Sequence, residues 1–342
     1  MKEIKTTEAI GHILCHDLTQ IIKGVAKGPR FRKGHVVTAE DIPVLLSMGK
    51  EHLFVWENDG SILHEDEAAA ILKELAQGRG MTASEPKEGK IELTAAYDGV
   101  LEIDIDRLDA LNDLDDITIA TLPPHMPVAT GMKLAGMRVI PLTIAREKME
   151  EAKKVAEGRP LLELHPYRPL KVGVVTTGSE VFKGLIKDTF TPVIEAKLKK
   201  FNLKVDEHRL SDDSTDCTLK EVNSLLELGM DMILCTGGMS VDPDDRTPAA
   251  IKATRAQVVT YGAPVLPGAM FMLAYLTKGE KQVPILGLPG CVMYCPATIF
   301  DIVLPRLVAG IEITRRDIRR LGAGGLCQNC KVCHYPNCGF GK

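Results

Sequence analysis

Apolar and polar residues follow different patterns in the two halves of the chain. After Pro169, apolar runs alternate with amphipathic stretches, as strands that alternate with helices do. The expected strands cover residues 172–176, 205–210, 230–235 and 283–288, and the expected helices cover residues 191–201, 219–226 and 292–307. This alternation is typical of a parallel sheet with helices on both faces. We therefore predict an α/β domain with a mostly parallel sheet over residues 170–312.

The first half of the chain has shorter apolar segments. Strands are expected at residues 31–37, 91–96, 100–105, 117–121 and 138–140, and helices at residues 65–77 and 144–157. Short strands separated by turn residues indicate a β-rich unit. We predict a mixed α/β, β-rich N-terminal domain over residues 1–165, which ends where Gly158, Pro160 and Pro166 interrupt the pattern.

Composition and charge narrow the class of protein. A chain of 342 residues is long enough for about two domains. Its formal net charge of −4 gives no support to nucleic acid or to an anionic membrane as the main partner. The N-terminus has no apolar signal core, and the longest apolar run, near residues 299–311, is broken by charged residues and a proline. We expect a soluble cytoplasmic protein.

Candidate chemistry lies where the predicted strands end. The segment TGGMSVDPDD, residues 236–245, follows a buried strand and precedes a predicted helix. Its two glycines let backbone N–H groups approach an anion closely, and its carboxylates can hold a cation beside that anion. Three further loops stand at strand ends: TTGSE at residues 176–180, SDD at 211–213 and GLPG at 287–290. Together they predict a phosphate-and-metal pocket.

Each of these residues also has a purely structural interpretation, and both interpretations stay open. Gly237 and Gly238 fit a tight turn from strand to helix. Asp212 and Asp213 precede a helix that either could cap. Glu180 suits the first turn of a helix, and the acidic run that contains Asp245 suits a solvated loop.

The C-terminal segment, residues 320–342, is rich in cysteine. Its sequence CQNCKVCHYPNC places Cys327, Cys330, Cys333 and Cys338 in the spacing C-x2-C-x2-C-x4-C. Four thiols so close together predict a metal site, because free thiols in an exposed tail are easily oxidised. The spacing leaves an iron–sulfur cluster, zinc and an unmetallated tail open. Cys291 and Cys295 share one face of the predicted helix, where packing is the simpler interpretation.

The four loops, in their order and spacing, resemble the molybdopterin-binding domain shared by molybdopterin molybdotransferases, molybdopterin adenylyltransferases and gephyrin. The resemblance covers roughly residues 171–310. Residues 8–18 and 32–55 also resemble N-terminal segments of the molybdotransferases. Two stretches differ from that branch: Leu266-Pro267-Gly268-Ala269 stands where it has Lys-Pro-Gly-Lys, and Cys291-Val292 stands where it has Asn-Pro.

The resemblance implies a site at these loops. It places Glu180, Asp212 and Asp245 around the substrate with Mg²⁺ and molybdate. The residues implied to face molybdopterin or adenylated molybdopterin are Thr177, Gly178, Ser179, Thr236, Gly237, Gly238, Ser240, Pro289 and Gly290. We expect a molybdotransferase-like activity that inserts molybdate into the pterin. Homo-oligomers are usual among the related enzymes.

A second hypothesis is a non-catalytic sensor or carrier of the molybdenum cofactor that docks a molybdoenzyme partner through its cysteine-rich tail. Adenylyl transfer is disfavoured, because Met239 and Ser240 interrupt the Gly-Thr-Gly pattern of the adenylyltransferase loop.

Overall fold

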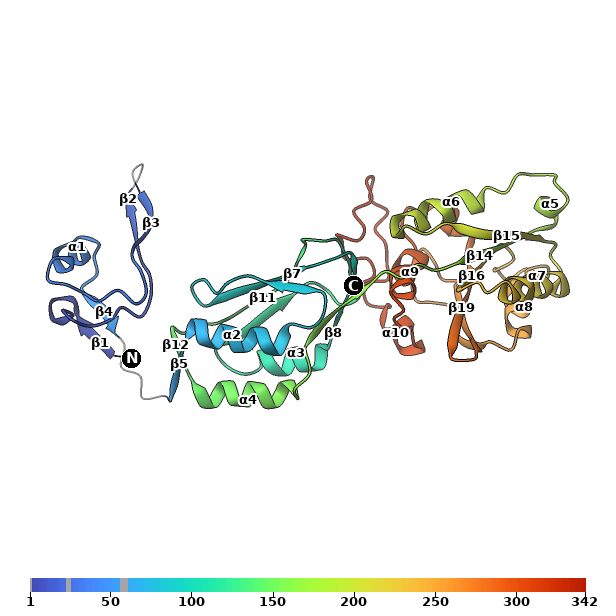
Figure 1. Ribbon diagram of the computed structural model, residues 1–342. Coiled ribbons are helices and arrows are strands. Elements are labelled where there is room, and N and C mark those ends of the chain that lie inside the picture. The colour runs from blue at the N-terminus through green and yellow to red at the C-terminus, as the bar shows by residue number, and fades with distance from the viewer. Residues whose placement is uncertain (1, 23–25, 56–60) are drawn as a thin grey trace. The chain divides into compact units, whose positions relative to one another are not determined.

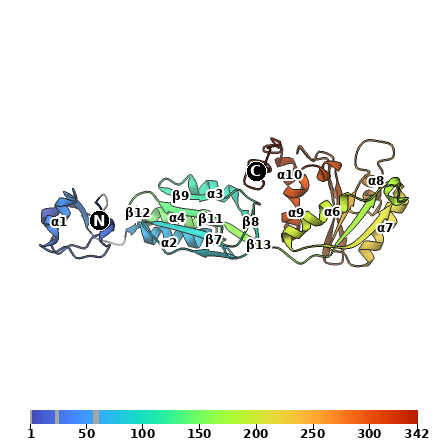
Figure 2. The same ribbon diagram turned by 90° about the horizontal axis from the view of Figure 1, so that it is seen from above.

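The computed structural model describes residues 2–22, 26–55 and 61–342 of the chain (Figures 1 and 2). It divides into two compact units. One unit contains the chain up to residue 96 together with residues 102–122 and 130–164, and the other contains residues 97–101, 123–129 and 165–342. None of the helices in these described ranges combines the length and apolarity that a membrane span requires.

The first unit is β-rich, as predicted, and its strands are short. Its elements are β1 (Lys2–Lys5), η1 (Thr6–Glu8), β2 (Leu18–Ile22), β3 (Ala26–Phe31), α1 (Asp41–Ser47), β4 (His52–Val55), β5 (Ile62–His64), α2 (Glu65–Ala76), β6 (Met81–Ala83), β7 (Lys90–Ala95), α3 (Ile105–Asn112), β9 (Ile117–Thr121), β11 (Lys133–Val139), β12 (Thr143–Ala145) and α4 (Arg146–Ala156). Its largest sheet has the order β6-β7-β11-β9 and is antiparallel throughout. A separate three-stranded sheet, which is not part of the first unit alone, has the order β10 (Pro127–Val128), β8 (Gly99–Ile103) and β13 (Leu162–Pro166).

One strand prediction for the first half is wrong, and one helix, α3, was not predicted. No strand covers residues 31–37 as expected: strand β3 precedes this range and ends at Phe31, because the chain turns at Gly34, whose φ is +85°. The strand expected at residues 100–105 ends at Ile103, and helix α3 follows it. Asp104 begins that helix by accepting a hydrogen bond from the backbone N–H of Arg107 at 3.2 Å.

The second unit is built on a six-stranded sheet. Its elements are β14 (Val172–Thr177), α5 (Ser179–Phe182), α6 (Phe190–Leu198), η2 (Lys199–Phe201), β15 (Val205–Ser211), α7 (Thr215–Glu227), β16 (Met232–Thr236), α8 (Thr247–Ala253), β17 (Gln257–Tyr261), β18 (Met272–Lys278), β19 (Lys281–Leu288), η3 (Gly290–Met293), α9 (Ile299–Ala309) and α10 (Arg315–Arg320). The strand order is β15-β14-β16-β19-β18-β17. The first four strands pair in parallel, β18 pairs antiparallel with β19, and β17 pairs antiparallel with β18. The predicted mostly parallel sheet is confirmed.

Helices cover both faces of this sheet (Figure 1). Successive strand residues point to opposite faces. Leu234 therefore packs with Ile194 of α6 and Phe300 of α9, whereas Ile233 packs with Val222 of α7 and Ile251 of α8. Because the central strands are buried on both sides, their carboxyl ends are held firmly as a platform for the loops that follow them.

The prediction of one long helix over residues 292–307 is wrong for the first half of that range. A short 3₁₀ helix, η3, ends at Met293, and α9 begins only at Ile299. Thr298 and Asp301 form a capping box that fixes this start, and Pro296 lies before it. Cys291 and Cys295 therefore do not belong to one long helix, although the N–H of Cys295 donates to the carbonyl of Cys291 at 2.9 Å.

Candidate functional site

The candidate site lies where the order of the parallel strands reverses. The chain leaves β14, forms β15 on one side of it, and then returns to form β16 on its other side (Figure 1). In open α/β sheets a ligand crevice lies at such a switch point, outside the carboxyl ends of the strands. The loops after β14 and β16 meet there, so two of the four predicted loops flank this position.

Hydrogen bonds join these two loops. The hydroxyl of Thr177, at the end of β14, donates to the carbonyl oxygen of Thr236 at 3.0 Å. Thr247, at the start of α8, donates its hydroxyl to the carbonyl of Gly237 at 2.9 Å and its backbone N–H to the carbonyl of Gly238 at 3.2 Å. The first loop, the glycine pair and the helix after it therefore form one rigid connection.

Gly237 and Gly238 are required by the geometry of this connection. Their φ angles are +85° and +56°, in the region that favours glycine. A Cβ atom on Gly237 would clash with the carbonyl oxygen of Thr177, and one on Gly238 would lie 2.9 Å from the hydroxyl of Thr247. The tight-turn interpretation is correct for both residues, and it is compatible with ligand binding. Within the described part of the chain, no group accepts a hydrogen bond from the backbone N–H of Gly238 or Ser240.

The hydroxyl group of Thr236 lacks a hydrogen-bond partner in the part of the chain that the structure describes. Its side chain is fully buried, and its hydroxyl oxygen has no hydrogen-bond partner among the described residues. A buried hydroxyl without a partner costs about 1–3 kcal/mol, so such groups are rare unless water or a ligand satisfies them. This unpaired hydroxyl lies at the end of β16, directly before the glycine pair.

Asp213, rather than Asp212, connects two loops. Its carboxylate accepts a hydrogen bond at 2.9 Å from the backbone N–H of Ser179 in the first loop. The carboxylate of Asp212 accepts from the hydroxyl and the backbone N–H of Ser214, and these bonds lower its pKa. Ser214 caps α7 by accepting from the N–H of Cys217, so the capping interpretation is wrong for both aspartates.

Glu180 and Asp245 are separate from these contacts. The Glu180 side chain is exposed and makes no hydrogen bond or ion pair within residues 61–342. Asp245 is half-buried, and one of its carboxylate oxygens accepts from the backbone N–H of Asp242 at 3.3 Å. Among the described residues, no three His, Cys, Asp or Glu side chains converge as ligands of one metal ion do. The structure thus brings the loops together without bringing Glu180, Asp212 and Asp245 to one point.

The fourth loop follows the neighbouring strand. Thr236 pairs with Leu288 in the β16–β19 register, which places Pro289 beside Gly237 at the same edge of the sheet. Pro289 is buried and begins η3, whereas Gly290 is exposed. Tyr261, at the end of β17, donates its hydroxyl to the carbonyl of Met239 at 3.3 Å and so supports the third loop from the other side.

A polar cluster beside the site was not predicted from the sequence. Asp188 accepts hydrogen bonds from the hydroxyls of Thr176 and Thr191, and His208 lies 3.2 Å from its carboxylate. Burial opposes ionisation of Asp188, but the hydrogen bonds from Thr191, Phe190 and Thr176 outweigh it and lower the pKa. The cluster ties the end of β14 to the start of α6. The sequence carries no motif for it, because its members come from three separate elements.

Replacing Asp188 by asparagine is expected to destabilise the second unit by about 1–3 kcal/mol at pH 7, since buried hydroxyls lose a charged acceptor. The pKa of Asp188 is depressed in the folded state, so its stabilisation is present above the ordinary aspartate pKa and is lost as the pH falls through the folded pKa. Urea unfolding at several pH values measures this difference. A difference that stays constant down to acid pH would contradict the assignment.

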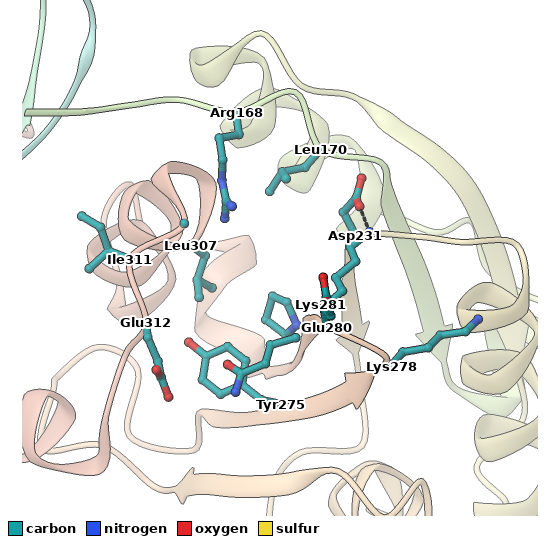
Figure 3. A pocket seen from close by; sticks show the side chains of 13 residues that line it. Arg168, Leu170, Asp231, Tyr275, Lys278, Glu280, Lys281, Leu307, Ile311 and Glu312 are labelled. Carbon is teal, nitrogen blue, oxygen red and sulfur yellow. Dashed lines mark hydrogen bonds and ion pairs between the residues drawn. The ribbon is translucent and has the colours of Figure 1, made fainter. Parts of the chain in front are cut away.

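The hollow in Figure 3 lies away from the candidate site, at the end of the sheet where the parallel strands begin. It has a volume of about 670 Å³ and includes Leu170 and Asp231, which precede β14 and β16. Within it, Lys281 pairs with Asp231, and the ammonium group of Lys278 donates to the carbonyl of Leu226 at 2.8 Å. The four predicted loops are not part of this hollow.

The four tail cysteines lie together at another place on the second unit. With Cys295 they line a cavity of about 300 Å³. Cys327 is half-buried, and Cys330, Cys333 and Cys338 are exposed. The spacing of the tail therefore brings its thiols to one cavity, although they do not converge on a single point.

These features define an open α/β domain whose loops after β14 and β16 meet at the switch point of its sheet. Residues 173–309 match the family model described as "Probable molybdopterin binding domain", as the resemblance of the four loops predicts. Residues 3–57 match a domain of unknown function, DUF8806.

Similarity to known proteins is concentrated in the same region. A molybdopterin molybdenumtransferase of Staphylococcus aureus (strain COL) is 30% identical over 112 residues, which are 31% of this chain and 26% of the relative. One from Staphylococcus epidermidis (strain ATCC 12228) is 28% identical over 111 residues, 30% of this chain and 26% of the relative. The match thus spans about a quarter of these relatives.

Solved structures with a similar chain path include the tungsten cofactor synthesizing protein MoaB of Pyrococcus furiosus. It is 18% identical with a TM-score of 0.36, over 43% of this chain and 98% of that one. The molybdopterin biosynthesis Mog protein of Mycobacterium ulcerans is 16% identical with a TM-score of 0.34, over 42% of this chain and 97% of that one.

Proposed function

We propose that this protein binds molybdopterin or adenylated molybdopterin at the switch point and inserts molybdate into it during biosynthesis of the molybdenum cofactor. The observation that carries the proposal is the hydrogen-bonded junction of Thr177 with the glycine loop, inside the domain that matches the molybdopterin-binding family. The backbone N–H groups of Gly238 and Ser240, which have no acceptor among the described residues, are suited to a phosphate.

The chain's own residues would bind and orient the substrates. The N–H groups of Gly238 and Ser240 would hold the terminal phosphate, because they have no other acceptor in the described part of the chain. The Asp213 bond to Ser179 would keep the first loop against the second. Ligand exchange at molybdate needs no covalent nucleophile, so positioning and charge would supply the rate enhancement.

The donor chemistry of the third loop fits Mg²⁺. Among the described residues the Asp245 carboxylate makes one long hydrogen bond, at 3.3 Å, and it therefore remains available to a cation. Mg²⁺ usually takes one or two protein carboxylates and completes its shell with water and substrate phosphates, so three converging carboxylates are not needed. Asp245 would hold the ion, and Glu180 is free to approach it. When bound, Mg²⁺ would neutralise phosphate charge.

A non-catalytic carrier is the second candidate, and one observation favours it. The loop Leu266-Pro267-Gly268-Ala269 has no charged side chain, and both backbone polar groups of Leu266 are hydrogen-bonded to the C-terminal tail, to Gly325 and Cys327. This loop therefore offers no cation to a second phosphate or to an adenylate. A carrier would bind the pterin without consuming molybdate or releasing AMP.

Asp245→Asn is expected to lower molybdate insertion by about 10–100-fold, because it removes the carboxylate proposed to hold Mg²⁺. The purified protein would be given adenylated molybdopterin, Mg²⁺ and molybdate, and AMP release and molybdenum incorporation would be measured. Asp242→Asn is the matched control, since Asp242 is exposed and contacts Asp245 only through its backbone. Unchanged insertion by Asp245→Asn would refute the catalytic role of Asp245. Tight binding without turnover by the unmodified protein would identify a carrier.

A further inference from the structure

The cavity at the C-terminal tail gathers an unusual set of side chains. Its wall contains the four tail cysteines, His334, and Cys295 from the segment between η3 and α9. Five of the nine cysteines of the chain thus border a space of about 300 Å³. Cys295 comes from the body of the domain, so this cavity is shared by the tail and the α/β fold.

The tail is held against the domain by specific backbone contacts. Leu266 donates its N–H to the carbonyl of Gly325 at 2.7 Å and accepts from the N–H of Cys327 at 2.8 Å. Further along, Gly341 donates to the carbonyl of Gly324 at 3.0 Å, which closes the tail into a loop. The first cysteine of the motif therefore lies next to an isolated parallel β-bridge, between Leu326 and Leu266, that fixes it to the domain.

Two aromatic side chains hold the far end of this loop. Phe340 is 4% exposed and packs into the main hydrophobic core of the unit. Tyr335 donates its hydroxyl to the carbonyl of Asp301 in α9 at 2.9 Å, and its ring lies 6.1 Å from that of Phe340 in an edge-to-face arrangement. Between these anchors Cys330, Cys333 and Cys338 are exposed at the edge of the cavity.

The tail has few other sources of stability. No helix or strand occurs after α10, and Gly325 and Phe340 are the only buried residues from 322 to 342. Short irregular segments of this kind usually need a disulfide or a metal as a staple. Within the described chain the tail cysteines form no disulfide, and a metal bound by them would supply such a staple.

The positions of the thiols indicate which kind of metal centre suits the cavity. A tetrahedral zinc ion needs four ligands within about 2.3 Å of one point, so it leaves almost no space between its ligands. An iron–sulfur cluster instead binds its cysteines at separate iron atoms, so the thiolates surround it without meeting. A cavity of about 300 Å³ that is lined by all four tail cysteines is larger than a single ion requires and suits the second arrangement.

We propose that this cavity holds an iron–sulfur cluster whose ligands are Cys327, Cys330, Cys333 and Cys338, and that the cluster fastens the tail to the domain next to Cys295. The cluster site does not depend on the proposed pterin chemistry. The two are physically connected, however, because Cys295 follows Gly290 of the fourth loop by only one short helix.

The full chain, purified without oxygen and reconstituted in parallel with ferrous iron plus sulfide or with Zn²⁺, tests the proposal. Iron and acid-labile sulfide in equal amounts, with visible absorbance that bleaches on reduction, are expected. Cys330→Ser and Cys333→Ser should each lower the iron retained after a chelator wash by at least about tenfold.

Cys291→Ser is the matched control, because Cys291 is half-buried in the same segment as Cys295 and does not line the cavity. It should retain iron like the unmodified protein. Protein that binds no iron, or that binds zinc stoichiometrically and excludes iron, would overturn the proposal. So would Cys330→Ser and Cys333→Ser proteins that keep their iron. Pterin binding is measured separately on the same samples, so failure of the cluster and failure of the proposed function are distinguishable.

Discussion

Lys197→Met is expected to lower the free energy of unfolding of the second unit by about 3–5 kcal/mol, because it leaves the buried carboxylate of Asp301 without its cation. The Lys197 ammonium group lies 2.7 and 2.8 Å from the two Asp301 oxygens and donates to the carbonyl of Pro296 at 3.1 Å. The two side chains are 7% and 8% exposed. Asp301 also caps α9, so the pair joins α6 to the start of α9.

Urea unfolding followed by circular dichroism measures this loss. Lys204→Met provides the control, since Lys204 faces Asp206 at 3.7 Å with 81% of its side chain exposed, and such surface pairs contribute about 0–1 kcal/mol. Similar losses for the two variants would show that the Lys197–Asp301 pair is not specifically stabilising.

Gly237→Ala is expected to weaken binding of molybdopterin by at least about tenfold, which corresponds to 1.4 kcal/mol. The added Cβ would clash with the Thr177 carbonyl, so the third loop must move away from the first. The backbone N–H groups that we propose to hold the phosphate would move with it. Anaerobic calorimetric titration with molybdopterin measures the dissociation constant.

Gly279→Ala separates this clash from backbone strain. Gly279 also has a positive φ, +64°, but a Cβ there meets nothing within 4 Å. The control should lose about 1–2 kcal/mol of stability and keep its affinity for the pterin. Equal affinities of the two variants would rule out the close approach at Gly237 as a requirement for binding.

Much of the second unit could be predicted because its strands are short apolar runs followed by loop residues. Strands β14, β15, β16 and β19 lie where the pattern places them, within about two residues. The apolar pattern predicted one helix at residues 292–307, because apolar residues continue through the interruption at Pro296 and through the capping box at Thr298. It also failed at α3, whose apolar residues continue the run of β8.

The loops that form the candidate site could be predicted from the sequence, but most of the side-chain contacts between them could not. Strand ends in a parallel sheet must share an edge, so the meeting of Thr177 with the glycine loop follows from the element order. The choice between Asp212 and Asp213 depends on side-chain directions that spacing does not encode. The docking of the tail on Leu266 joins segments about 60 residues apart without a shared pattern, and only the folded structure shows it.

The edges of the six-stranded sheet limit how other proteins can dock. β15 forms one edge and carries four successive polar residues, Asp206, Glu207, His208 and Arg209. Charged side chains on an edge strand discourage the addition of a foreign strand. β17 forms the other edge, where α8 and α10 lie against it. A partner protein is therefore expected to recognise side-chain surfaces of this domain rather than extend its sheet, and the same edges should protect the folded protein from strand-mediated aggregation.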